Sequence, residues 1–184
     1  MTEKIISRIS GRKEVYTNEY VWVDVDAVGM SSALYIKNVK FDNVFDNERV
    51  YVTDDHSIPP SSIEMANHNI LLRKFVNKYN ITNFFDANNY GIQHELFPNY
   101  GFVAPGEFVV LDDSHATSIG CYNALACSVF EEMPYILEYG RTWLKVPECI
   151  NIELRGNLNS DKYVLGMDIA LKLAQKYRNR FWNI

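Results

Sequence analysis

Residues 107–115 read EFVVLDDSH, a short apolar run that ends in two aspartates, a serine and a histidine, and this stretch decides the fold. Residues 49–56, RVYVTDDH, repeat the same order, and residues 83–86, NFFD, repeat it in a shorter form. Short runs of β-branched and aromatic residues bounded by polar residues are typical of buried strands. The three stretches therefore predict three strands, each of which ends in acids.

Helical patterns separate these predicted strands. Ser61 and Glu64 form a capping box, and apolar residues then recur at helical spacing as far as Tyr79. Further helices are expected from a cap at Thr2 to an end at Gly11, after His115 through Ala124, Ala126 and Cys127, and from a cap at Ser160 or Asp161 through Tyr177. Another segment, through 135–139, is expected to end at Gly140. Strands that alternate with helices predict a three-layer α/β/α domain with a largely parallel sheet. No linker is evident, so we expect one domain over residues 1–184.

Two segments alternate between apolar and polar residues as strands do. These are residues 20–26 and residues 150–155, and the second is expected to be half exposed. Residues 27–48 give no clear pattern.

Composition excludes several classes of function. The chain has 18 Lys plus Arg against 23 Asp plus Glu and a net charge of −5, so it offers no basic field for nucleic acid. No apolar stretch approaches the length of about 20 residues that a membrane span requires. The three cysteines, Cys121, Cys127 and Cys149, lack paired short spacing, which disfavours a disulfide framework and favours a cytoplasmic protein.

Acids and histidines follow the predicted strands, and this placement indicates a site. Loops at the carboxyl ends of parallel strands meet at one edge of the sheet, where open α/β proteins bind ligands. Imidazoles beside carboxylates are suited to general acid–base chemistry. The candidates are Asp55, His56, Asp86, His94, Asp113, Ser114 and His115. Of these, His94 is expected in a loop that contains Gly91.

Other interpretations of these residues remain open. Any single aspartate after a strand more often caps the next turn or helix, although convergence of the whole group favours a site. No metal site is assigned, because a zinc interpretation lacks a close pair of ligands on one helix. A hydrolase with Ser114 as nucleophile is disfavoured because no glycine elbow surrounds that serine. His68 is expected to be a solvated or core-edge residue.

Seven motifs, in this order, resemble the aconitase superfamily, and most closely its 3-isopropylmalate dehydratase and homoaconitase branch. They are DDHSIP at 54–59, LRKF at 72–75, FFD at 84–86, GIQH at 91–94, VAPGE at 103–107, DSH at 113–115 and TWLKVPE at 142–148. The resemblance implies the N-terminal α/β region of that family.

The resemblance also implies a hydro-lyase that acts on a hydroxy di- or tricarboxylate and uses a [4Fe-4S] cluster whose open iron is a Lewis acid. Carried over to this chain, Asp55 and His56 form one acid–imidazole pair, and His94 with Asp113 forms a second that protonates the departing hydroxyl. Ser114 and His115 match positions that line the pocket, and we expect Ser114 and Asp86 to contact the substrate. The base would be a serine of a swivelling domain or small subunit that this chain lacks.

Several departures from the family pattern leave two hypotheses. The cluster cysteines of the family, two of them in a Cys-x-x-Cys, lie in a part without counterpart here, and Ala116, Glu95 and residues 27–30 differ from family motifs. The first hypothesis is one component of a split dehydratase, with companion chains that supply the cluster cysteines and the swivelling domain, or a homo-oligomer. The second is a degenerate homologue that acts as a binding or interaction module. A metal hydrolase is a more distant third.

Overall fold

The computed structural model describes residues 1–56, 58–89, 91–155 and 164–177. It divides into two compact units, Met1–Val146 and Pro147–Ile184, and each unit is described by itself. The single domain expected over the whole chain stays a prediction.

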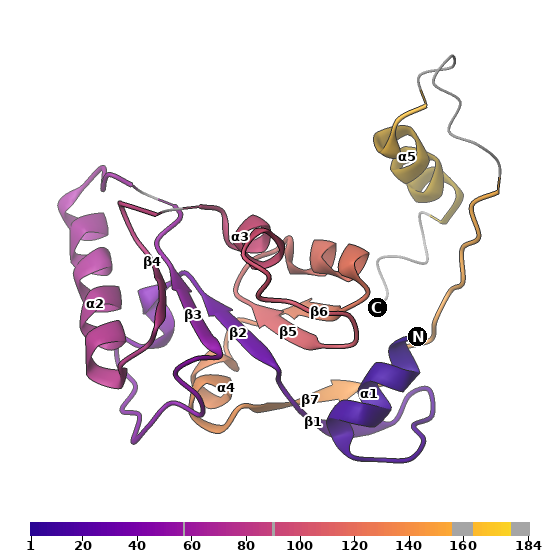
Figure 1. The fold of residues 1–184 in the computed structure, drawn as a ribbon, viewed down its shortest axis with the longest axis horizontal. Helices are drawn as coiled ribbons and strands as arrows, with labels where there is room; N and C mark the ends of the chain where they lie inside the picture. Colours follow the sequence, from indigo (N-terminus) through magenta and orange to yellow (C-terminus); the bar gives the residue numbers. More distant parts are fainter. Residues whose placement is uncertain (57, 90, 156–163, 178–184) are drawn as a thin grey trace. The chain divides into compact units, whose positions relative to one another are not determined.

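A five-stranded parallel sheet forms the centre of the first unit (Figure 1). The strands lie in the order β4-β3-β2-β5-β6. Their bounds are Ala27–Met30 for β2, Val50–Thr53 for β3, Asn83–Phe85 for β4, Phe108–Leu111 for β5 and Leu125–Ser128 for β6. The predicted parallel sheet is confirmed. Of the three strands that precede acids, β3 and β5 are completely buried, and β4 lies at the edge of the sheet beside β3.

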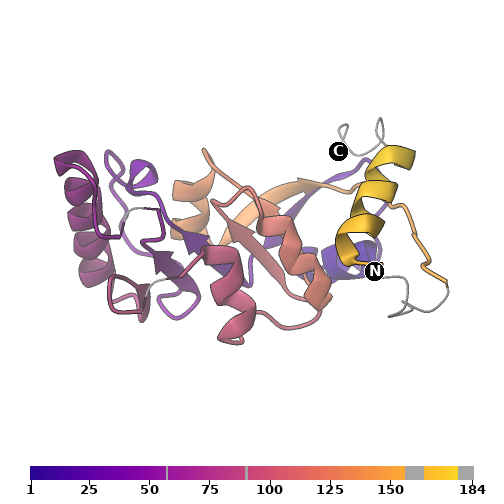
Figure 2. The ribbon, with the colours of Figure 1, turned by 90° about the horizontal axis from the view of Figure 1, so that it is seen from above.

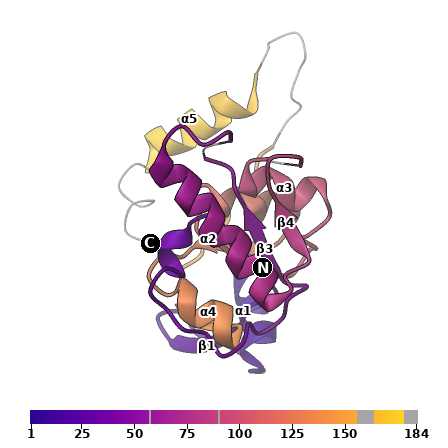
Figure 3. The same cartoon turned by 90° about the vertical axis from the view of Figure 1, so that its left-hand side faces the viewer.

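Helices cover both faces of this sheet, which confirms the three-layer α/β architecture. One face packs against α1 (Thr2–Ser10), α2 (Ile63–Tyr79) and α4 (Met133–Tyr139). The other packs against α3 (Gln93–Asn99) and the 3₁₀ helix η2 (Ala116–Tyr122). Figure 2 shows α3 and α4 on opposite sides of the strands, and Figure 3 views the sheet from the side of α2.

The direction of the chain across the sheet reverses between β2 and β5. The chain moves outward from β2 to β3 and β4, and it then returns to the other side of β2 for β5 and β6. Right-handed crossovers require the connections to change faces at such a reversal. The connection through α2 accordingly lies on one face, and α3 and η2 lie on the other. Open α/β sheets commonly bind ligands at such a reversal point, beyond the carboxyl ends of the strands.

The first unit also contains a separate antiparallel pair of strands. Strand β1 (Tyr20–Asp24) pairs with β7 (Arg141–Lys145), with Trp22 opposite Trp143. Its alternation of exposed and buried residues confirms the predicted strand at 20–26, although the strand ends two residues earlier. Helix α1 buries Ile5, Ile6 and Ile9 and ends at Gly11 in the left-handed conformation, as predicted.

Four local predictions were wrong. Residues Leu125–Ser128 form strand β6 and not a helix, because Asn123 ends η2 in the left-handed conformation and the following backbone pairs with β5. The cap of α2 is Ser62, whose hydroxyl accepts from the Met65 amide, and not Ser61. His94 lies in the first turn of α3 and not in a loop. Residues 150–155 form no strand, because the described part of the second unit holds no strand with which they could pair.

In the second unit, α5 (Gly166–Tyr177) is the helix predicted near the end of the chain. Its predicted cap at Ser160 or Asp161 lies outside the described residues. In the part of the chain that the structure describes, every helix is too short or too polar to cross a membrane.

An ion pair ties α2 to the end of β4. Arg73 Nε lies 2.7 Å from Asp86 Oδ2, and Arg73 Nη2 lies 2.9 Å from Asp86 Oδ1. The guanidinium lowers the pKa of Asp86 below its usual range, and a hydrogen bond from the Ala87 amide adds to this effect.

We predict that Arg73→Met lowers the free energy of unfolding at neutral pH by about 1 kcal/mol, the upper range for a largely exposed pair. Because the folded pKa of Asp86 is depressed, the pair stabilises the fold above the unfolded pKa, and this stabilisation is lost as the pH falls below about 4. Urea unfolding across this pH range measures the effect. Lys74→Met, which alters the exposed neighbouring residue, is the control, and an Arg73 effect that persists at low pH would contradict the assignment.

Gly140 occupies a conformation and a space that only glycine fits. Its φ is +65°, and a Cβ there would lie 2.5 Å from the ring of Phe45. Gly11 has a similar φ of +66° with no atom near the position of a Cβ. We predict that Gly11→Ala costs about 1 kcal/mol, whereas Gly140→Ala costs about 2 to 4 kcal/mol because overpacking adds to the backbone strain.

Thermal and urea unfolding of the two variants separate these contributions. In a Phe45→Ala background the cost of Gly140→Ala should fall to that of Gly11→Ala. Equal costs of the two alanine variants in the native background would show that the contact with Phe45 is unimportant.

Candidate acid–base site

The site lies where the chain reverses direction, at the carboxyl ends of β2 and β5. Asp112 directly follows β5, and its carboxylate accepts hydrogen bonds from the backbone amides of Ser31, at 2.9 and 2.8 Å, and of Ser32, at 2.9 Å. Burial raises the pKa of Asp112, and these amides counteract part of the increase. The carboxylate thereby links the loops that follow the two central strands.

The next residue, Asp113, places its carboxylate between two imidazoles. Oδ2 contacts Nδ1 of His94, and Oδ1 lies 3.3 Å from Nδ1 of His115 and accepts from the His115 amide at 2.7 Å. Ser128 donates to the carbonyl of Asp113 at 2.7 Å. Burial raises the pKa of Asp113, but the hydrogen bonds from the His115 amide and from His94 together lower it by more, so the net pKa lies below its usual range.

The two imidazoles stack, with ring centroids 5.0 Å apart and an angle of 26° between the planes. The side chain of His94 is 18% exposed and that of His115 is 71% exposed, so one ring is held and the other is open to solvent. Contact of His94 Nδ1 with Asp113 leaves Nε2 as the atom through which His94 can exchange a proton. Ser114 lies beside this pair, with Oγ 3.3 Å from Nδ1 of His115.

Asp55 and His56 form a second pair at the end of β3. Asp55 contacts Nδ1 of His56, and its other oxygen accepts from the backbone amide of Gln93 at 3.2 Å. Asp55 is therefore joined to the residue immediately before His94. His56 itself is 80% exposed, and the described contacts link it to the stacked imidazoles only through Asp55. The structure thus brings together two of the three predicted histidines.

Gln93 is a residue that the sequence did not single out. It is completely buried, and neither Nε2 nor Oε1 has a hydrogen-bond partner among the described residues. It lies over Gly29 of β2, where a Cβ would come within 3.0 Å of Nε2 and within 2.5 Å of Leu111. A glycine in the middle of an apolar strand indicates that another group approaches the backbone closely, so Gly29 was the feature of the sequence that could have pointed to this contact.

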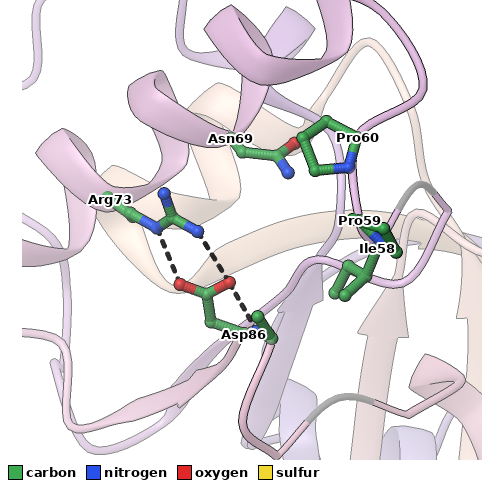
Figure 4. A pocket seen from close by; sticks show the side chains of 7 residues that line it. Ile58, Pro59, Pro60, Asn69, Arg73 and Asp86 are labelled. Carbon is green, nitrogen blue, oxygen red and sulfur yellow. Dashed lines mark hydrogen bonds and ion pairs between the residues drawn. The ribbon is translucent and has the colours of Figure 1, made fainter.

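Asp86 lies apart from the stacked histidines, in a pocket between α2 and β4 (Figure 4). This cavity has a volume of about 320 Å³ and is lined by Arg73, Asn69 and a loop that includes Pro59. Contact of Asp86 with a substrate stays a prediction, since its observed partner is Arg73.

His68, on α2, accepts from the Ala33 amide at 2.8 Å, which agrees with a core-edge role.

The cysteines of the chain do not fit a [4Fe-4S] cluster. Burial raises the pKa of the Cys127 thiol to about 12, whereas a cluster ligand must be a thiolate. Cys121 is exposed at the end of η2, and Cys149 belongs to the second unit. The group of possible metal ligands that the described residues bring together is His94, Asp113 and His115, without a cysteine.

Comparisons with known proteins identify the family of the chain. Residues 17–182 match the sequence model of the Aconitase family (aconitate hydratase). The chain is 38% identical over 183 residues to the 3-isopropylmalate dehydratase large subunit of Caldanaerobacter subterraneus subsp. tengcongensis, a match that covers 96% of this chain and 43% of the relative. It is 37% identical to the large subunit of Thermoanaerobacter pseudethanolicus, with the same coverage. It is 33% identical to a probable large subunit of Methanothermobacter thermautotrophicus, with 94% and 42% covered.

The chain therefore spans less than half the length of these relatives. The match nevertheless includes the parallel sheet and every residue of the candidate site. The chain belongs to the aconitase family.

Proposed function

We propose that this chain is a component of an aconitase-type hydro-lyase, which removes water from a hydroxy di- or tricarboxylate and adds it back. Family membership and the names of the relatives support the reaction class. The observation that carries the proposal is the His94–Asp113 pair beside His115 at the reversal point of the sheet. Open α/β sheets bind small ligands at this point.

Loss of water requires an acid, because hydroxide is a poor leaving group. We propose His94 as this acid, with the proton carried on Nε2 toward the leaving hydroxyl. The carboxylate of Asp113 holds Nδ1 and orients the ring. The low pKa of Asp113 keeps this carboxylate charged at neutral pH. In the reverse direction the same nitrogen accepts a proton from the water that adds.

We propose that His115 and Ser114 contact the substrate from the exposed side of the site. We also propose that Asp55 and His56 form a second acid–base pair. The base that removes the carbon-bound proton would come from outside this chain.

We propose that the cluster of this family is held by cysteines of a companion chain, since the three cysteines of this chain do not fit one. A cytoplasmic location belongs to the same proposal, because the thiols are free and the substrate is a small metabolite.

An exposed aromatic surface favours a second candidate function, a non-catalytic binding module. Tyr20 lies 5.6 Å from Trp143, and Trp22 lies 5.9 Å from Tyr135, measured between ring centroids. All four side chains are exposed, and exposed aromatic clusters are enriched at protein interfaces. The acid–base pairs favour the hydro-lyase, because a pure scaffold has no need of partly buried ionisable groups.

We predict that His94→Asn abolishes turnover while leaving substrate binding nearly intact. Asparagine can still donate to Asp113 but cannot deliver a proton, so kcat should fall about 10²- to 10⁴-fold with a KM within a few-fold of the original. The assay uses the Caldanaerobacter dehydratase with the matched part of its large subunit replaced by this chain. Formation of the conjugated unsaturated acid is followed by ultraviolet absorbance.

Glu95→Gln is the matched control, since Glu95 is the exposed neighbour of His94 on α3. This variant should retain turnover. Retained turnover in the His94→Asn variant would remove His94 from the acid role. An unmutated chimera that assembles and holds its cluster but shows no turnover would contradict the hydro-lyase and support the binding module.

A further inference from the structure

We propose that His94, Asp113 and His115 also form a binding site for one divalent transition-metal ion of the zinc or ferrous type. One nitrogen from each ring and one oxygen of the carboxylate all lie within 4.8 Å of one another. This site needs no cysteine and is distinct from the cluster of the family. It can be tested on the free chain, independently of the proposed hydro-lyase activity.

The ligand atoms lie near enough for one ion to bind them after a local movement. Around a four-coordinate ion with bonds of about 2.0 to 2.2 Å, two ligand atoms are about 3.3 to 3.6 Å apart. The three ligand atoms here lie within 4.8 Å of one another, so the more distant of them have to approach, and the contact between His94 and Asp113 has to open. His115 can supply this movement, because its ring is mostly exposed, whereas the ring of His94 is largely buried and contacts Asp113.

The carboxylate is already fixed before an ion binds. The carbonyl of Asp113 accepts from Ser128 at 2.7 Å, and Oδ1 accepts from the backbone amide of His115 at 2.7 Å. A ligand held in this way loses little conformational entropy when it binds an ion. Preorganised ligands of this kind are typical of metal sites.

The ligand types also favour a cation of this class. A divalent ion binds both rings in their neutral form and displaces the proton of His94 Nδ1 to solvent. Two imidazoles and one carboxylate are ligands typical of zinc and non-haem ferrous ions, whereas magnesium and calcium prefer oxygen alone. Water can complete the coordination on the exposed side of His115.

Binding of an ion at this site would interfere with the proposed acid role of His94. An ion bound to His94 and Asp113 replaces the contact that orients His94 as an acid. The same ion should therefore inhibit any hydro-lyase that contains this chain.

The test is a titration of the purified full chain with Zn²⁺ by calorimetry and with Co²⁺ by visible absorption, in a Cys121→Ser, Cys149→Ser background that removes the exposed thiols. We expect one ion per chain and the absorption bands of four- or five-coordinate cobalt. His115→Ala and Asp113→Asn should each lower the affinity at least tenfold and remove these bands.

His56→Ala is the matched control, because His56 is an exposed histidine beside a carboxylate at the same edge of the sheet. This variant should bind the ion unchanged. Circular dichroism checks the fold, and the exposure of His115 allows its replacement without unfolding. Binding that survives in His115→Ala, or that is lost equally in His56→Ala, would overturn the proposal, as would the absence of binding by the unmutated chain.

Discussion

The structure depends on a largely buried carboxylate that joins the two strands at which the chain reverses direction. Asp112 accepts hydrogen bonds from the backbone amides of Ser31 and Ser32, and these bonds offset the cost of burying its charge. They hold the loop after β2 against the end of β5, so that Asp113 projects from a fixed place. Gly29 completes the arrangement, because only glycine lets Gln93 lie over β2 and bring the first turn of α3, with His94, above the end of β5.

The sequence predicted the parts of the fold whose patterns are local. Short apolar runs that end in acids identified β3, β4 and β5, and helical spacing identified α2. Strand β2 was missed because its four residues, AVGM, include an alanine and a glycine and only one β-branched residue, so they show no strand pattern. Strand β6 was mistaken for a helix because Ala126 and Cys127 fit either structure, and only pairing with β5 decides between them. Residues 150–155 carry a strand pattern, but a strand also needs a neighbour.

The order of the strands in the sheet explains which of the predicted site residues lie together. His94, Asp113 and His115 meet because β5 and the first turn of α3 lie together at the reversal point. Neighbouring strands are about 4.8 Å apart, so the end of β4, with Asp86, lies about 14 Å from the end of β5. His56 follows β3 at an intermediate distance. The two residues of each Asp-Asp pair have different roles. Asp54 and Asp112 are shielded from solvent, whereas Asp55 and Asp113 hold imidazoles.

The central claim is that the fold of the free chain alone holds His94 against Asp113. A ¹⁵N–¹H correlation spectrum of the imidazoles in the full chain, near neutral pH, tests this claim most directly. The account predicts a proton on Nδ1 of His94 that exchanges slowly with solvent and shifts to lower field through its hydrogen bond. This signal should vanish in Asp113→Asn but remain in Asp55→Asn. A His94 ring with freely exchanging protons, or a signal indifferent to the loss of the Asp113 carboxylate, would contradict the account.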